Sequence, residues 1–122
     1  MKYELTQEFY FEAAHTLNRE LETESSRRIH GHTYHVEITV CGTPDSQTGM
    51  LVDLERFRNS LAIVRDQLDH RMLDEVVGLG TPTLEHLCEF IARTLRASLP
   101  ILSKVTVARR ASGDKCTLRL DA

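Results

Sequence analysis

The sequence predicts an α+β domain in which a four-stranded antiparallel sheet carries two helices on one face. Segments near both ends of the chain alternate apolar and polar residues, which is the pattern of half-buried strands, and two central segments place apolar residues at helical spacing. The chain has 122 residues and shows neither a repeat nor a low-complexity linker. We therefore expect a single domain over residues 1–122 with the element order ββααββ.

Two strands are predicted in the first part of the chain. Within residues 3–11 four odd positions are apolar and lie between polar neighbours, and within residues 35–40 the even positions are aliphatic. A period of two puts each apolar set on one face of its strand. Residues 18–28 are polar without an apolar period, so they are predicted to form a surface loop that returns the chain to the sheet.

Two helices are predicted in the centre of the chain. From Asp53 to Leu68 the apolar residues recur at spacings of three and four, and Asp53 itself is suited to cap the helix N-terminus. Thr83 takes the same capping position ahead of a second apolar stripe, which runs to Leu99 before Pro100 ends the helix. Each stripe provides one face that can pack on the sheet.

The chain is predicted to finish with a hairpin. Val105 and Val107 mark one short strand, residues 116–120 alternate as another, and residues 112–114 supply the turn. These strands bring the sheet to four. A sheet of this kind has two open edges, which invite pairing between subunits, so a homo-oligomer is expected.

Charge and cysteine content narrow the class of protein. There are 18 acids against 15 bases, a formal charge of −3, and no long basic run, so the footprint of a nucleic-acid binder is missing. The N-terminus alternates in polarity and lacks the features of a secretory signal. Three cysteines without a C-x-x-C pair suggest free thiols in a reducing compartment. We expect a cytoplasmic protein that acts on a small molecule and has neither nucleic acid nor membrane as a partner.

Three histidines form the candidate chemical centre. His30 and His32 are an H-x-H pair at the entrance to the second strand, where both imidazoles share a face. His15 continues the odd, apolar parity of the first strand, so the three rings converge if no bulge intervenes near Ala13. Three neutral imidazoles without a fourth protein ligand are typical of catalytic zinc, although copper and iron also accept imidazole. A bare H-x-H pair, by contrast, is more often two unrelated surface histidines.

Five segments in order connect the chain to a known family. They are F-E-A-A-H (11–15), H-G-H-T-Y (30–34), G-M-L-V-D-L (49–54), L-D-H (68–70) and P-T-L-E (82–85). Together they resemble the 6-pyruvoyl- and 6-carboxy-tetrahydropterin synthases. The resemblance implies a tunnelling fold, in which the sheets of three subunits join into a barrel and two trimers stack as a hexamer. Active sites would then lie between subunits.

The resemblance also implies catalytic roles. The three histidines would bind Zn²⁺, and Asp69 with His70 would transfer protons, whereas the plain alternative for that pair is a helix C-terminus with a favourably placed histidine. The base of the family is a cysteine four residues before H-G-H. This chain has Ser26 there, and a serine hydroxyl is far less acidic than a thiol.

Substrate contacts are implied near the second helix and the third strand. Thr83 and Glu85 would contact the pterin, although an acid in a first helical turn also suits the helix dipole. The family holds the amino-pyrimidine edge of the pterin with a glutamate after a V-x-V, and counting from Val107 that place here is Arg109. Arginine offers only donors and would bind a carboxylate or phosphate instead, unless the register is shifted by one or two residues.

The sequence thus predicts a zinc-dependent lyase resembling 6-carboxy-tetrahydropterin synthase. The implied reaction converts dihydroneopterin triphosphate by side-chain cleavage and loss of triphosphate, and it feeds deazapurine (queuosine) synthesis. The alternative is a diverged zinc-binding paralogue with another substrate, as Ser26 and Arg109 suggest. A third possibility is a metal-binding or interaction module without catalysis.

Overall fold

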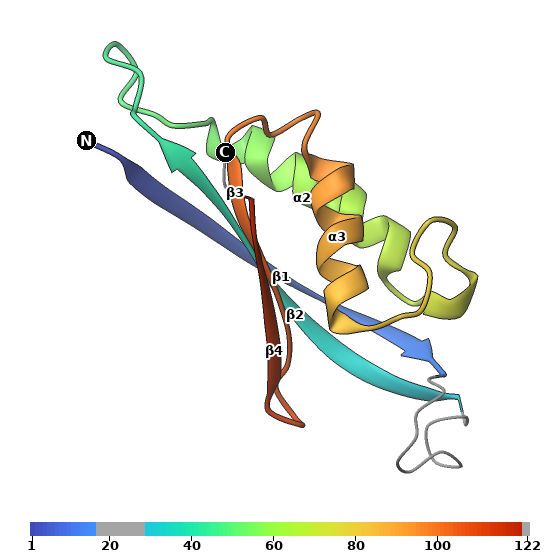
Figure 1. The fold of residues 1–122 in the computed structure, drawn as a ribbon. Coiled ribbons are helices and arrows are strands. Elements are labelled where there is room, and N and C mark those ends of the chain that lie inside the picture. Colours follow the sequence, from blue (N-terminus) through green and yellow to red (C-terminus); the bar gives the residue numbers. More distant parts are fainter. Residues whose placement is uncertain (17–28, 121–122) are drawn as a thin grey trace.

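The computed structural model describes residues 1–16 and 29–120 and shows an α+β fold (Figure 1). One antiparallel sheet has the strand order β1-β2-β3-β4. Its strands are β1 (Tyr3–His15), β2 (His30–Gly42), β3 (Leu102–Arg109) and β4 (Asp114–Arg119). The helices are α2 (Leu54–Leu68), the short 3-10 helix η1 (Leu73–Glu75) and α3 (Leu84–Leu95). Both α-helices lie on one face of the sheet, so the predicted fold class and element order are confirmed (Figure 1).

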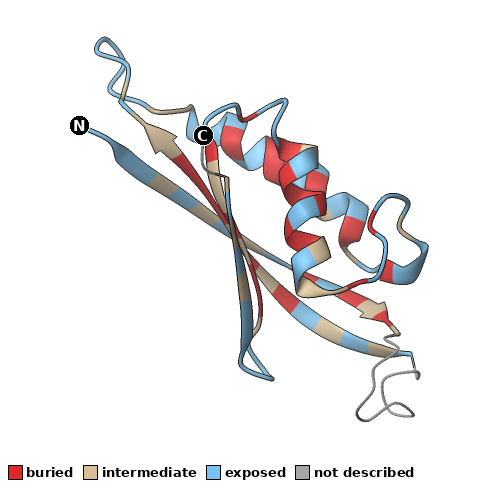
Figure 2. Cartoon of the chain, in the orientation of Figure 1, coloured by how far each residue is buried: buried red, intermediate tan, exposed pale blue. Residues whose placement is uncertain are grey.

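The core lies between the helices and the strand faces that the period-two pattern predicts to be apolar. Figure 2 shows the buried residues on the helix sides that face the sheet and at alternate positions of the strands. The largest fully buried side chains include Phe11, Tyr34, Ile38, Phe57, Leu68, Leu87 and Ile91. The apolar face of β1 is covered only toward its C-terminal end, since Tyr3 is 49% exposed and Phe11 is fully buried.

Both predicted helix N-caps are confirmed. The Asp53 carboxylate accepts hydrogen bonds from the backbone N–H groups of Glu55 and Arg56 at 2.9 and 3.1 Å. The Thr83 hydroxyl accepts one from the His86 N–H at 3.1 Å. Each cap satisfies a helix N–H group that has no partner within its own helix. None of the described helices is long and apolar enough to span a membrane.

The predicted end of the second helix is wrong. Helix α3 ends at Leu95 with Arg96 as its C-cap, and not at Leu99. Leu99 is buried as the apolar stripe predicts, and its N–H still bonds to the Leu95 carbonyl at 2.8 Å. Pro100 disfavours helical backbone at the residue before it, so the last turn loosens before the chain enters β3.

The register of β1 and β2 brings the predicted histidines together. His15 lies opposite His30 and Ala13 opposite His32, in an unbroken ladder that begins at Tyr3 and Gly42. The irregularity that the sheet does contain lies between Thr39 and Val40, where β2 meets β3. No bulge therefore separates the histidines, and all three share the face that the helices cover.

The buried thiol of Cys88 gives a first testable prediction. Its Sγ lies 3.5 Å from the Cys116 carbonyl oxygen, and burial raises its pKa to about 12. At pH 8 the thiolate fraction is then about 10⁻⁴, against roughly a quarter for an ordinary cysteine. We expect iodoacetamide to alkylate Cys41 at least a hundredfold faster than Cys88 in the native protein, measured by peptide mass spectrometry. Equal rates in native protein, with the fold intact by circular dichroism, would contradict this burial.

Candidate metal centre

Three imidazoles meet at the end of the β1–β2 ladder. One ring nitrogen from each of His15, His30 and His32 lies within 4.8 Å of the others. The centroid of the His15 ring lies 4.4 Å from that of His30 and 4.9 Å from that of His32. The centroids of the His30 and His32 rings are 5.0 Å apart. The hydrogen-bonded pairing of β1 and β2 holds the three rings in this arrangement. Within the described part of the chain, no carboxylate or thiol joins these three in the group.

His15 is oriented as a metal ligand. Its side chain is 1% exposed, and its Nδ1 lies 3.2 Å from the carbonyl oxygen of Thr16, which places the ring proton on Nδ1. Nε2 is then a lone-pair acceptor, and it is buried without a hydrogen-bond partner among the described residues. An orphaned buried acceptor is costly unless a ligand satisfies it. This atom therefore fits a metal ion.

The electrostatic environment keeps His15 and His32 neutral. Burial lowers the pKa of His15, and burial together with the Arg109 charge lowers the pKa of His32 to about 4. Both rings are therefore uncharged near neutral pH, as metal ligands must be. Nitrogen donors in a set of three suit Zn²⁺ with one coordination position left open. The residues present thus fit the ion that the sequence predicts.

A hydrogen-bond chain outside the cluster fixes His15. Thr16, whose carbonyl holds the ring, bonds to the carboxylate of Asp74 in η1 through its N–H at 2.9 Å and its hydroxyl at 2.7 Å. Sequence reasoning missed both η1 and Asp74, because this contact joins residues 58 positions apart and no periodicity marks a three-residue helix. Outer partners of this kind orient metal ligands and tune their affinity.

Asp74→Asn should weaken metal binding without unfolding the protein. Loss of the carboxylate loosens Thr16 and hence the His15 ring, for which a fall in zinc affinity of about 10- to 100-fold is typical. Competition with a chromophoric chelator measures the change. Glu75→Gln, the same charge change at the next residue of η1, is the matched control and should leave the affinity unaltered. An equal loss in both variants would mean that only the net charge matters.

The three predicted substrate-binding residues lie around one pocket. Thr83 and Glu85 at the N-terminus of α3, and Arg109 at the end of β3, line a pocket of about 810 Å³ together with Tyr34. Arg109 Nη2 donates to the Asp114 carboxylate at 3.0 Å, and its Nη1 lies 3.5 Å from His32 Nε2. Arg109 therefore connects the pocket with the histidine cluster.

The predicted proton-transfer pair forms on the outer side of β1. His70 Nδ1 lies 2.9 Å from an Asp69 carboxylate oxygen, while the other oxygen accepts from the Glu12 N–H at 2.9 Å. That backbone bond is the main reason why the pKa of Asp69 lies below its usual range. His70 is exposed and has a φ of 58°, a left-handed backbone that is uncommon for residues other than glycine. Strained backbone of this kind is concentrated at functional sites.

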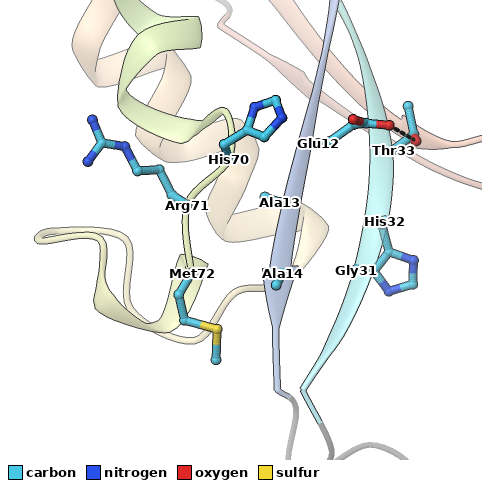
Figure 3. Close-up of a pocket in the computed structure, with 9 residues that line it drawn as sticks. All are labelled: Glu12, Ala13, Ala14, Gly31, His32, Thr33, His70, Arg71 and Met72. Carbon is cyan, nitrogen blue, oxygen red and sulfur yellow. Dashed lines mark hydrogen bonds between the residues drawn. The ribbon is translucent and has the colours of Figure 1, made fainter.

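His70 lies outside the group of three histidines that could hold a metal ion. A pocket of about 560 Å³ is lined by Glu12, Gly31, His32 and His70. Figure 3 shows the His70 ring on the α2 side of β1 and the His32 ring beyond β2. The Asp69–His70 pair therefore lies at the outer edge of β1, apart from the histidine cluster at the β1–β2 strand ends.

The remaining predicted residues are either outside the described part of the chain or away from the histidine cluster. Ser26 and the predicted surface loop lie outside the described residues. His35 and His86, which the sequence assigns to structural roles, stand apart from the cluster. On the opposite strand face, the ring centroids of His35 and Tyr10 are 6.0 Å apart. His86 Nδ1 lies 2.7 Å from the Thr81 carbonyl oxygen.

The chain is a small α+β domain with two helices on one face of its sheet. Its three clustered histidines, at the ends of β1 and β2, can hold a metal ion. The model of the 6-pyruvoyl tetrahydropterin synthase family matches residues 4–120. The chain therefore belongs to that family, and its relatives indicate an enzyme of the tetrahydropterin synthase type.

Individual relatives agree with this assignment. The 6-carboxy-5,6,7,8-tetrahydropterin synthase of Synechocystis sp. is 36% identical over 106 residues, covering 82% of this chain and 81% of the relative. The dihydroneopterin monophosphate aldolase of Pyrococcus furiosus is 29% identical over 100 residues, with coverages of 82% and 81%. The structure of Caenorhabditis elegans 6-pyruvoyl tetrahydropterin synthase has a TM-score of 0.83 at 23% identity, covering 99% of this chain and 97% of that one.

Proposed function

We propose that the protein is a zinc-dependent lyase of the 6-carboxy-tetrahydropterin synthase type, which cleaves the side chain of dihydroneopterin triphosphate with loss of triphosphate. The observation that supports this most is the orphaned Nε2 of buried His15 beside two further imidazoles. The Synechocystis relative supports the subtype. In such a site a zinc ion would polarise oxygens of the substrate side chain and make their protons more acidic.

The residues of the chain divide the remaining work. The Thr16 carbonyl keeps the proton of His15 on Nδ1, and burial keeps His32 neutral, so both rings are ready to bind the ion. Asp69, ionised by its bond to the Glu12 N–H, orients the His70 imidazole. His70 is exposed, so it is free to give a proton to a substrate or take one from it.

The separation of His70 from the cluster supports a site shared between copies of the chain. Each subunit would contribute its histidine cluster to one site and its Asp69–His70 pair to another, in a trimer or a dimer of trimers. The exposure of His70 and the open sheet edges suit this arrangement. Ser26 would take the catalytic role of the family's cysteine.

A diverged paralogue with another substrate is the second candidate. Arg109 turns inward at the position where the family's pterin-anchoring glutamate is expected, and it contacts His32. One relative is named for an aldolase reaction on dihydroneopterin monophosphate, so the family includes more than one pterin reaction.

One experiment separates these functions. The purified protein is analysed for zinc per chain and then incubated with dihydroneopterin triphosphate, while pterin products and acetaldehyde are followed by chromatography. One zinc per chain with formation of 6-carboxy-tetrahydropterin and acetaldehyde is the result we expect. Zinc without turnover of this substrate, but with turnover of the monophosphate, would favour the paralogue. A protein that binds zinc and converts neither would be a binding module.

A further inference from the structure

Two residues that line the pocket next to the histidine cluster each carry a buried hydrogen-bond donor with no acceptor among the described residues. Tyr34 is 1% exposed, and among the described residues neither its hydroxyl nor Nε of Arg109 has a hydrogen-bond partner. Both residues line the pocket of about 810 Å³, which we call the Arg109 pocket. Buried donors are rarely left without an acceptor, so a ligand that fills this pocket is expected to supply one.

The chemistry of these donors selects a negatively charged oxygen ligand. Arginine stays protonated and offers only N–H donors. The hydroxyl of a tyrosine is protonated near neutral pH and can donate. The Tyr34 ring also packs edge-on against His32 at 5.7 Å. Both donors therefore stand beside the candidate metal position.

The charge of Arg109 lies close to the candidate metal position, which also favours binding of an anion. Its Nη1 lies 3.5 Å from His32 Nε2. When the cluster holds a metal cation, two positive charges stand close together in a partly buried place. Only one of them has a counter-charge among the described residues, the Asp114 carboxylate at 3.0 Å from Nη2. An anion beside both charges would relieve this repulsion.

We propose that the Arg109 pocket binds a carboxylate group of the substrate or product beside the metal centre, with Arg109 Nε and the Tyr34 hydroxyl as donors. Arg109 thereby sets specificity for a pterin whose side chain carries a carboxylate. The proposal rests on the proposed function for the pterin and the metal. It goes beyond it by assigning the group that Arg109 recognises.

The charges around the pocket favour a carboxylate over a phosphate. Its charged lining residues are Arg109 and Lys115 against Glu85 and Asp114, so they balance. A singly charged group gains the two donors at little electrostatic cost. A doubly charged phosphate would also meet repulsion from the two acids. Glu85, exposed at the helix N-terminus, remains available for the N–H groups of a pterin ring.

Binding of two matched pterins to the zinc-loaded protein tests the proposal. The probes are 6-carboxypterin and neutral 6-hydroxymethylpterin, and their dissociation constants are measured by titration calorimetry. We expect the wild type to prefer the carboxylate by about tenfold or more, as a charge-assisted contact implies. Arg109→Gln should abolish the preference, and Tyr34→Phe should reduce it several-fold. Arg110→Gln, which removes the neighbouring exposed cation outside the pocket, is the matched control and should retain it.

Two further measurements test whether each variant is folded and whether the bound anion is a carboxylate or a phosphate. Thermal melts followed by circular dichroism show that each variant is folded, and Arg109→Lys, which keeps the charge but loses Nε, should recover only part of the preference. Acetate should compete with 6-carboxypterin better than inorganic phosphate does; the reverse order would overturn the carboxylate assignment. Equal affinity of the wild type for both pterins would also overturn it, while leaving the proposed lyase standing. If neither pterin binds but acetate binds in an Arg109-dependent way, the proposed function fails and the anion pocket remains.

Discussion

Replacing His15 with leucine will empty the candidate metal centre and leave the metal-free protein at least as stable as before. The change removes one of three ligands, so zinc content should fall from about one per chain to near zero. Loss of a ligand must exceed the 10- to 100-fold cost of losing an outer partner. Lyase activity should disappear with the metal.

The stability of the metal-free variant separates a ligand from an ordinary core histidine. His15 buries an acceptor that has no partner among the described residues, and such a group costs about 1–3 kcal/mol. Leucine removes that cost but also loses the bond to the Thr16 carbonyl, so we expect a free energy of unfolding that is unchanged or higher by about 1 kcal/mol.

Elemental analysis and urea denaturation of the chelator-treated proteins measure the two effects. His35→Leu is the matched control, because His35 is a histidine of β2 on the opposite strand face, and it should keep its zinc. A His15→Leu protein that retained stoichiometric zinc, or lost several kcal/mol without it, would show that His15 is structural.

Replacing His70 with glycine will lower turnover sharply and will not destabilise the fold. Removal of a positioned acid or base typically costs 10²- to 10⁴-fold in rate. The left-handed backbone at His70, with φ of 58°, is unfavourable for a residue with a Cβ, and glycine relieves about 1 kcal/mol of that strain. Steady-state kinetics of the zinc-loaded variant and its thermal melt should therefore move in opposite directions. If the histidine only ended the helix, activity would be retained.

Asp69→Asn adds a pH signature to this test. The folded pKa of Asp69 lies below its usual range, chiefly because its carboxylate accepts from the Glu12 N–H. A lowered pKa means that the charged carboxylate stabilises the fold above the unfolded value of about 3.9 and that this contribution is lost as the pH falls through the folded value. The variant should therefore be less stable than the wild type at pH 7 and approach it near pH 3, in urea melts at both pH values.

The local patterns of the sequence were enough to predict the fold and the position of the histidines. Period-two alternation puts residues of equal parity on one strand face, so His30 and His32 share the face of Val36 and Ile38 without any knowledge of tertiary structure. Asp53 and Thr83 carry capping side chains, and each caps the helix that follows it.

Contacts between distant parts of the chain could not be predicted in this way. Arg109 reaches His32 across 77 positions, and Asp74 reaches Thr16 across 58. Neither contact follows from periodicity, because each depends on how β3 and η1 are placed against the strand ends. The apolar pattern also could not predict the end of α3, because Leu99 is buried although the helix ends at Leu95.

The segment that follows α2 controls where a neighbouring strand can dock on β1. The Asp69 carboxylate and the Arg71 carbonyl accept from the Glu12 and Ala14 N–H groups, and Arg65 donates to the Tyr10 carbonyl at 2.9 Å. These contacts occupy several of the outward-facing backbone groups of the C-terminal part of this edge strand. An added strand would therefore find unoccupied backbone groups on β1 mainly along its N-terminal half, so the strand end beside His15 is protected from edge-to-edge aggregation.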